Sequence, residues 1–192
     1  MGTTIDLQDL LKSAVIAGVV AAFVNQGLVW IKEWAREAKA LKLRRQHAAL
    51  ALAVALERYA LACAHGVQAI RQGMADAAQY HNPDHLVTEV PDLVLPQAAD
   101  AQCLPAALVA RVLAVPLEIR YAQECVRAAV YEVDDFVAAD VAIPKVGRLG
   151  WDAWNTAIAL RSRQGLPDAE LNIDFTAWDF RDCLRIAATA RQ

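Results

Sequence analysis

Residues 13–31 read SAVIAGVVAAFVNQGLVWI, a stretch without a single Asp, Glu, Lys or Arg. At a rise of about 1.5 Å per residue, a helix over this stretch is about 28 Å long, close to the hydrocarbon thickness of a bilayer. We therefore predict one transmembrane helix, within a membrane-anchor unit at residues 1–31. The polar run Asn25-Gln26-Gly27 lowers the hydropathy of the second half and is the weakness of this interpretation.

The residues that follow the apolar stretch are typical of the water side of a membrane anchor. Trp30 and Trp34 stand four residues apart, where an aromatic belt would lie. Cations come with them at Lys32, Arg36 and Lys39. Because positive charge stays on the cytoplasmic side, we expect a short outer N-terminus and a cytoplasmic C-terminal bulk, which is single-pass topology.

Small residues occupy every fourth position along one face of the predicted anchor. The row consists of Ala14, Gly18 and Ala22 and ends in the amide of Gln26. In lipid, small residues let two helix backbones approach, and an amide gains a hydrogen-bond partner across the contact. We therefore predict that the anchor associates with itself or with a protein partner.

The net charge conceals an uneven distribution. The chain has 192 residues and a formal charge of −3, to which residues 1–45 contribute about +3 and the remainder about −6. An acidic bulk argues against a nucleic-acid-binding surface, so no nucleic-acid partner is expected. Lys42, Arg44 and Arg45 are candidates for contact with anionic lipid head groups.

Beyond the anchor, the pattern predicts an all-α fold, with an antiparallel helical bundle over residues 32–192. The first helix is expected to continue to Tyr80, because no proline interrupts it. An irregular connection, apolar enough to lie against the bundle, is expected at residues 81–104. Pro116 is expected to kink or split the next helical region. Further helices are predicted at residues 105–142, 149–164 and 177–190.

Apolar side chains at helical spacing predict the faces that pack inward. In the first helix the expected inward residues are Leu50, Leu52, Val54, Leu56, Tyr59, Leu61, Cys63, Ile70 and Met74. In the later helices they are Ile119, Val126, Val130, Val133, Val137, Trp154, Ile158, Trp178, Cys183, Leu184 and Ile186. The four cysteines form no CxxC pair and are expected to be free, buried thiols. Tyrosine rings are expected in the core with their hydroxyl groups at its edge.

Motifs for enzymatic chemistry are missing from the sequence. It has no phosphate-binding glycine loop, no HExxH and no GxSxG, and its only serines are Ser13 and Ser162. The loop that contains His81, His85 and Asp92 holds metal-ligand residue types, but Pro83 separates its two histidines. We therefore predict no catalytic, cofactor or metal site, and an enzyme is disfavoured; a metalloenzyme would have to use this loop.

These features favour a membrane-anchored helical bundle that acts through protein–protein interaction, as a non-enzymatic accessory or oligomeric component. Its expected partners are the lipid bilayer and either a second copy or another protein. Two alternatives stay open. One is a soluble α-helical protein that buries residues 1–31 in its own core or in a partner, and the other is a pore-forming effector in which Asn25 and Gln26 line a polar cavity.

Overall fold

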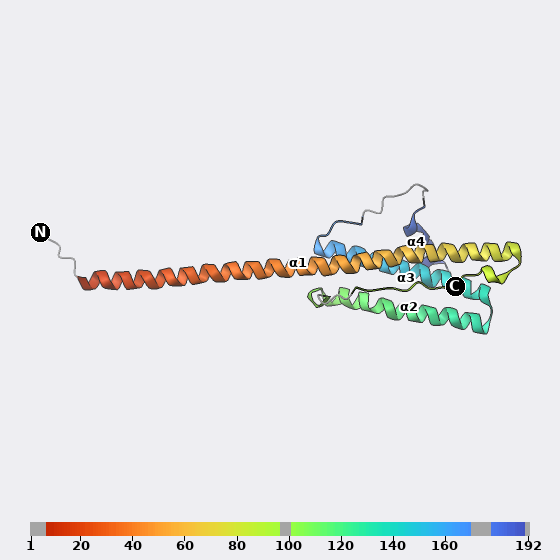
Figure 1. The fold of residues 1–192 in the computed structure, drawn as a ribbon, viewed down its shortest axis with the longest axis horizontal. Helices are drawn as coiled ribbons and strands as arrows, with labels where there is room; N and C mark the ends of the chain where they lie inside the picture. Colours follow the sequence, from red (N-terminus) through yellow and green to blue (C-terminus); the bar gives the residue numbers. More distant parts are fainter. Residues whose placement is uncertain (1–6, 97–100, 170–177, 191–192) are drawn as a thin grey trace. The chain divides into compact units, whose positions relative to one another are not determined.

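The computed structural model describes residues 7–96, 101–169 and 178–190, and among these the side chains of residues 7–25, 27–28 and 101 are not described. Within these ranges the fold is helical throughout, without a β-strand, which confirms the all-α prediction (Figure 1). The elements are α1 (Leu7–Tyr80), η1 (Pro83–His85), η2 (Ala101–Cys103), α2 (Ala106–Glu132), α3 (Asp135–Gln164) and α4 (Phe180–Thr189).

The contacts of the chain divide it into two units, Met1–Leu43 and Arg44–Gln192. Helix α1 contributes to both units, because it runs without interruption from Leu7 to Tyr80. Its C-terminal end at Tyr80 confirms the prediction from the sequence. The predicted division between an anchor at residues 1–31 and a bundle at 32–192 stays a prediction.

In the unit Arg44–Gln192, α3 runs antiparallel to both α1 and α2 (Figure 1). Helices α1 and α2 run in the same direction, because the connection between them returns along the bundle. Gly66 of α1 lies against Pro91 of this connection, and Gly73 lies against the backbone of His85. Val90 is buried, which confirms that the connection packs on the bundle. Partly buried side chains accompany it at Leu86, Leu93 and Leu95.

Most of the predicted inward face of α1 is buried as expected. Leu52, Leu56, Tyr59, Cys63 and Ile70 lie in the core, with Met74 partly buried against it. Leu50 was predicted wrongly and is exposed, because the packing surface of α1 is centred on alanines instead. The fully buried alanines of this surface are Ala49, Ala53, Ala60 and Ala64. Small side chains there let neighbouring elements approach closely.

Of the two predicted effects of Pro116, a kink or a split, the split is wrong. Helix α2 passes through Pro116 and ends at Glu132, and α3 passes through Pro144 and continues to Gln164. A proline removes one backbone hydrogen bond from a helix, and here the core packing on both sides of it holds each helix together. The true boundary is at Asp134, whose carboxylate accepts a hydrogen bond from the backbone N–H of Val137 at 2.8 Å. It is therefore the N-cap of α3.

Helix α4 packs on α3 through two glycines, Gly147 and Gly150. A Cβ atom on Gly150 would lie 2.6 Å from both Cys63 Cβ and Leu184 Cδ2, and one on Gly147 would meet Ala187. Trp154 of α3 also meets Phe180 of α4 edge to face, with ring centroids 5.0 Å apart. Gly147 and Gly150 are thus helical residues that admit a neighbouring helix.

Several apolar side chains that were predicted to face inward are exposed instead. They are Val130, Val133, Ile158 and Ile186. The tyrosine prediction is also wrong, since Tyr80, Tyr121 and Tyr131 are exposed while Tyr59 is buried together with its hydroxyl group. The common reason is that each later helix packs on one side only, so its apolar stripe is wider than its contact.

Candidate functional site

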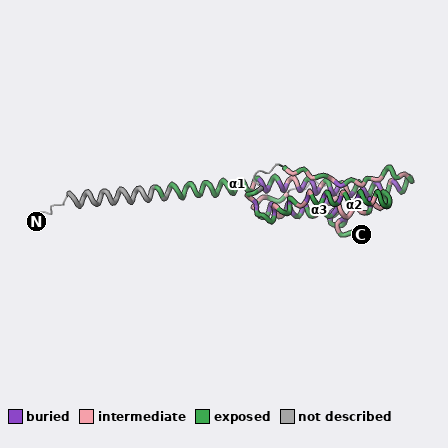
Figure 2. The backbone as a smooth tube through the Cα atoms, turned by 90° about the horizontal axis from the view of Figure 1, so that it is seen from below, coloured by how far each residue is buried: buried purple, intermediate pink, exposed green. Residues whose placement is uncertain are grey.

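The stretch Val29–Leu43 of α1, which we name the basic flank, is exposed along its whole length (Figure 2). Trp30 and Trp34 are 71% and 73% exposed. Lys32, Arg36 and Lys39 are exposed as well, and none of them forms an ion pair with a described carboxylate. Aromatic and cationic side chains are therefore free to meet a partner outside the described chain.

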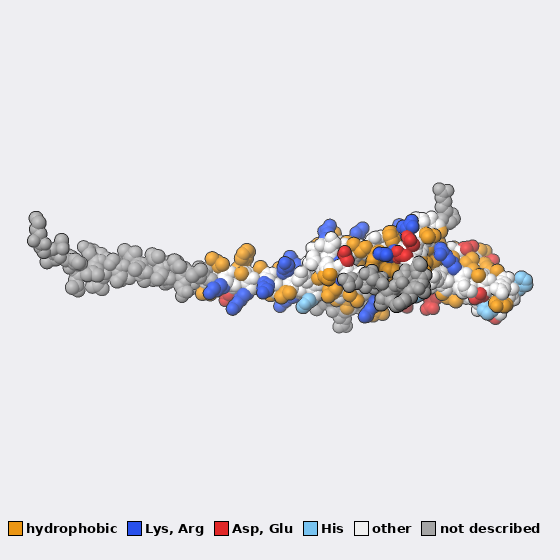
Figure 3. Space-filling model, turned by 90° about the horizontal axis from the view of Figure 1, so that it is seen from above, with side chains coloured by type: hydrophobic (Ala, Val, Ile, Leu, Met, Phe, Trp, Pro, Cys, Tyr) orange, Lys and Arg blue, Asp and Glu red, His pale blue; other side chains and the backbone are white. Residues whose placement is uncertain are grey.

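The tryptophans and most cations of the basic flank fall on different sides of the helix, whereas Val29 and Leu43 fall among the cations. At about 100° per residue, Trp34 and Leu41 fall within about 40° of Trp30 around the helix axis. Measured from Trp30 around the helix axis, Lys32 is about 160° away, Arg36 about 120° away and Lys39 about 180° away. Figure 3 shows hydrophobic and basic side chains on different edges of this stretch, next to the part drawn in grey.

The predicted association row has one residue whose side chain is described. Gln26 is exposed. Ala14, Gly18 and Ala22 belong to α1, but their side chains lie outside the described residues. Association through this row stays a prediction.

By length and composition, one helix within the described residues is able to cross a membrane, Val29–Tyr80. Half of its apolar window is buried, and core helices of soluble proteins share this property. The uncharged stretch that the sequence singled out lies mostly before Val29. The span is therefore weak support for a membrane location, and it does not show which side the bulk occupies.

Among the described residues the bundle has one buried ion pair, Glu57–Arg161, which the sequence pattern did not predict. The Arg161 guanidinium donates to the Glu57 carboxylate from Nε at 2.5 Å and from Nη2 at 2.9 Å, and its Nη1 donates to the carbonyl of Pro167 at 2.8 Å. The hydrogen bond to Glu57 raises the pKa of Arg161. A cation whose donors are committed in this way links α1, α3 and the loop after α3, and its role is structural.

The cysteine buried in the core is chemically inert. Burial raises the pKa of the Cys63 thiol to about 12. Burial, and then Cys63, also raise the pKa of Tyr59. A thiol that stays protonated is a poor nucleophile. Cys63, Cys103, Cys125 and Cys183 are all free, as predicted, but only Cys63 is fully buried.

A shallow groove runs between α2 and α3. Two adjoining hollows of about 240 and 320 Å³ share Glu118 and Asp152 as lining residues. The Lys145 ammonium lies 5.1 Å from the centroid of the Tyr121 ring, and Arg148 pairs with Asp152 at 3.7 Å. Because its own opposite charges already face one another, the groove has no single ligand chemistry.

The outer face of α2 carries several large, exposed apolar side chains. Leu113, Leu117 and Tyr121 lie four residues apart and are 64%, 72% and 67% exposed, and Tyr131 continues the face at 83%. The helix also carries equal numbers of cations and carboxylates. These are Arg111, Arg120 and Arg127, and Glu118, Glu124 and Glu132. Arg120, Glu124 and Arg127 fall within about 40° of Leu113 around the helix axis, so this face combines exposed apolar side chains with charges of both signs.

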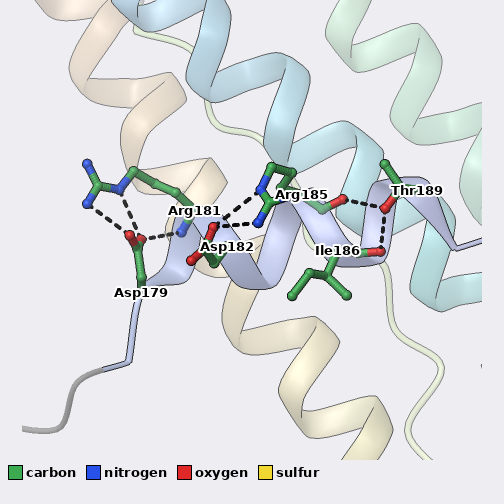
Figure 4. A network of polar contacts seen from close by, with 6 residues as sticks. All are labelled: Asp179, Arg181, Asp182, Arg185, Ile186 and Thr189. Carbon is green, nitrogen blue, oxygen red and sulfur yellow. Dashed lines mark hydrogen bonds and ion pairs between the residues drawn. The ribbon is translucent and has the colours of Figure 1, made fainter.

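Helix α4 carries a surface network of ion pairs (Figure 4). Asp179, the N-cap, accepts from the backbone N–H of Arg181 at 2.8 Å and pairs with its guanidinium at 2.9 Å. The hydrogen bonds from Arg181 lower the pKa of Asp179. Asp182 pairs with Arg185 one turn on. The predicted helix start at residue 177 lies outside the described residues, and α4 begins at Phe180. The network caps the helix, and the guanidinium groups of Arg181 and Arg185 donate to its own carboxylates.

The polar loop after α1 serves to turn the chain. His81 has a positive φ of 53°, and the Asn82 side chain accepts from the backbone N–H of Asp84 at 3.0 Å. In the described ranges, no three His, Cys, Asp or Glu side chains gather as a metal site would require.

Known proteins supply no further guide to this chain, since it matches no protein-family model, no curated protein and no solved structure.

Proposed function

We propose that the protein is a single-pass membrane-anchored helical bundle whose C-terminal bulk lies in the cytoplasm. The observation that carries this proposal is the full exposure of Val29–Leu43, directly after the uncharged stretch on the same continuous helix. Two exposed tryptophans followed by cations match the interface of a bilayer, where indole rings lie at the head groups and cations lie beyond.

The bundle acts by associating with protein, and a second copy is the partner that the outer face of α2 fits. A large exposed apolar patch is typical of an interaction site. Leu113, Leu117 and Tyr121 supply such a patch. Because α2 carries as many cations as carboxylates, two copies of this face meet without net repulsion, as an isologous contact requires.

Alkaline extraction of membranes tests the anchor with the full-length chain. We expect the protein to stay in the membrane pellet after a high-pH wash. Val20→Asp, a charge within the uncharged stretch, is expected to release it, because an aspartate at the centre of a spanning helix costs about 2.5–3.5 kcal/mol. Leu41→Asp is the matched control and should leave retention unchanged. Release of the unmodified protein by alkali contradicts the proposal and favours the soluble alternative.

Cross-linking in membranes tests the association. We expect a cross-linked dimer that Leu117→Asp removes, because the substitution places a charge in the centre of the apolar face. Val94→Asp is the control, since Val94 is also exposed, at 84%, but lies on the connection after α1. Dimers that persist in the Leu117 variant overturn the role of α2 and leave the predicted row in the anchor as the site of contact.

A further inference from the structure

We propose that the basic flank binds the phosphate of anionic lipid head groups, chiefly through Lys32 and Arg36. This inference rests on the proposed membrane anchoring and names the lipid class that the anchor selects. In Val29–Leu43 the cations are Lys32, Arg36, Lys39 and Lys42, against the carboxylates of Glu33 and Glu37. The flank therefore has a net positive charge, and all of its side chains are exposed.

Most cations of the flank are separated from its acidic residues around the helix, and Glu33 falls about 60° from Arg36. At about 100° per residue, Glu37 falls within about 20° of Trp30, whereas Lys32 and Lys39 fall on the opposite side. One side of the helix thus presents cations without an intervening carboxylate. On that side the Arg36 guanidinium adds a planar set of donors that matches two phosphate oxygens, and a lysine acts as a point charge.

Distance along the helix separates the cations that reach head groups from those that do not. If Trp30 marks the interface, Lys32 lies about 3 Å and Arg36 about 9 Å beyond it, whereas Lys42 lies about 18 Å beyond it. The head-group layer on each side of a bilayer is about 5–8 Å thick. Lys32 therefore lies within the head-group layer and Arg36 about 1–4 Å past it, within reach of its long side chain, while Lys42 is about a Debye length past the layer.

Lipid selectivity of the full-length protein in vesicles tests this inference. The protein is reconstituted in phosphatidylcholine vesicles that contain spin-labelled phosphatidylserine or spin-labelled phosphatidylcholine, and the label immobilised at the protein is measured. A cation at head-group level is expected to favour the anionic lipid about fivefold. Equal immobilisation of the two labels overturns the inference. Failure to enter neutral vesicles at all is a different result, because it overturns the proposed anchoring.

Two matched variants locate the contact. Lys32→Gln is expected to reduce the preference several-fold, whereas Lys42→Gln, the same change on the same exposed helix, should alter it less than about twofold. Lys32→Arg keeps the charge and should keep the preference. Equal losses in Lys32→Gln and Lys42→Gln overturn the assignment to Lys32 and Arg36.

Competition with inorganic phosphate tests whether the basic flank binds lipid phosphate or the free phosphate anion. At equal ionic strength, phosphate and chloride are expected to weaken the lipid preference equally, because both only screen the charges. A markedly stronger effect of phosphate overturns the lipid assignment and identifies a site for the free anion.

Discussion

Helix α1 passes through two environments without a break. From Val29 to Leu43 every side chain is exposed. Between Ala48 and Ala77, buried side chains recur along the helix and alternate with exposed ones. Both stretches are rich in alanine and good helix formers, so the backbone is the same in both. The difference comes from what packs against them. The second stretch meets α3 and the connection after α1, whose contacts with it include Glu57–Arg161 and Gly66–Pro91.

An uninterrupted helix therefore reflects the local helix propensity of its residues and does not indicate which of them are buried. A residue on α1 gains stability from burial when another element covers it, and it depends on a partner outside the chain when none does. The two stretches should therefore respond to substitution in different assays, one in unfolding and the other in membrane binding.

The largest expected effect is in the buried stretch, at the ion pair of α1 with α3. Glu57→Ala leaves the Arg161 cation buried without its partner and should lower the free energy of unfolding by about 3–5 kcal/mol. Chemical denaturation measures the change. The matched control is Glu124→Ala at the exposed pair with Arg127, whose side chains are 64% and 62% exposed, and it should cost about 1 kcal/mol or less. Similar losses in the two variants would contradict the distinction.

The second expected effect compares the two stretches directly. Leu56→Ala removes a fully buried side chain and should cost about 2–5 kcal/mol in unfolding free energy. Trp34→Ala removes a larger side chain that is 73% exposed, and it should change the unfolding free energy by about 0.5 kcal/mol or less. Thermal unfolding of both variants is the measurement. A large loss in the Trp34 variant would show that the basic flank packs on the protein itself.

Glycine substitutions sharpen the comparison where α1 meets other elements. Gly150→Ala forces a Cβ against Cys63 and Leu184 at 2.6 Å, and overpacking of this kind costs about 1–3 kcal/mol. Gly66→Ala meets Pro91 Cγ at an ordinary 3.4 Å, so the better helix propensity of alanine should raise stability by up to about 1 kcal/mol. Denaturant midpoints of the two variants should move in opposite directions.

The smallest expected effect is pH-dependent and belongs to the exposed cap of α4. The pKa of Asp179 is lowered by Arg181, so its contribution is complete above the ordinary pKa of an aspartate, about 3.9, and is lost as the pH falls through the lowered value. Because the two side chains are 36% and 56% exposed, the loss should be about 0.5 kcal/mol or less. Asp179→Asn should remove this decrease of the unfolding free energy at low pH, measured by denaturant unfolding as a function of pH.

Helix ends that carry a local signal could be predicted from the sequence. The end of α1 at Tyr80 precedes a turn with Pro83, and α3 ends at Gln164 before Gly165, which adopts a left-handed φ of 63°. Pro116 misled the prediction of a split, because a helix tolerates a proline where packing on both sides compensates for the lost hydrogen bond, as it also does at Pro144. Nothing local distinguishes these two prolines from helix-ending ones.

The candidate site was predictable in part. Trp30, Lys32 and their neighbours were identified from the order of apolar, aromatic and basic residues, although their exposure could not be read from that order. The Glu57–Arg161 pair was missed because its members stand 104 positions apart in the sequence. One signal was available, since Glu57 and Arg58 are the only Asp, Glu, Lys or Arg between Arg45 and Arg71, and Glu57 follows the buried Leu56.

By itself, the sequence determined the helical backbone and the C-terminal ends of α1 and α3. It also set the order in which an uncharged stretch, two tryptophans and a basic run follow one another. These depend on propensities and hydrogen bonds that act over a few residues. Only the tertiary structure decided which alanine-rich face of α1 is buried, that α1 and α2 run in the same direction, and which carboxylate Arg161 meets. Those outcomes depend on burial and charge pairing between segments that are far apart in the chain, where no local pattern records the partner.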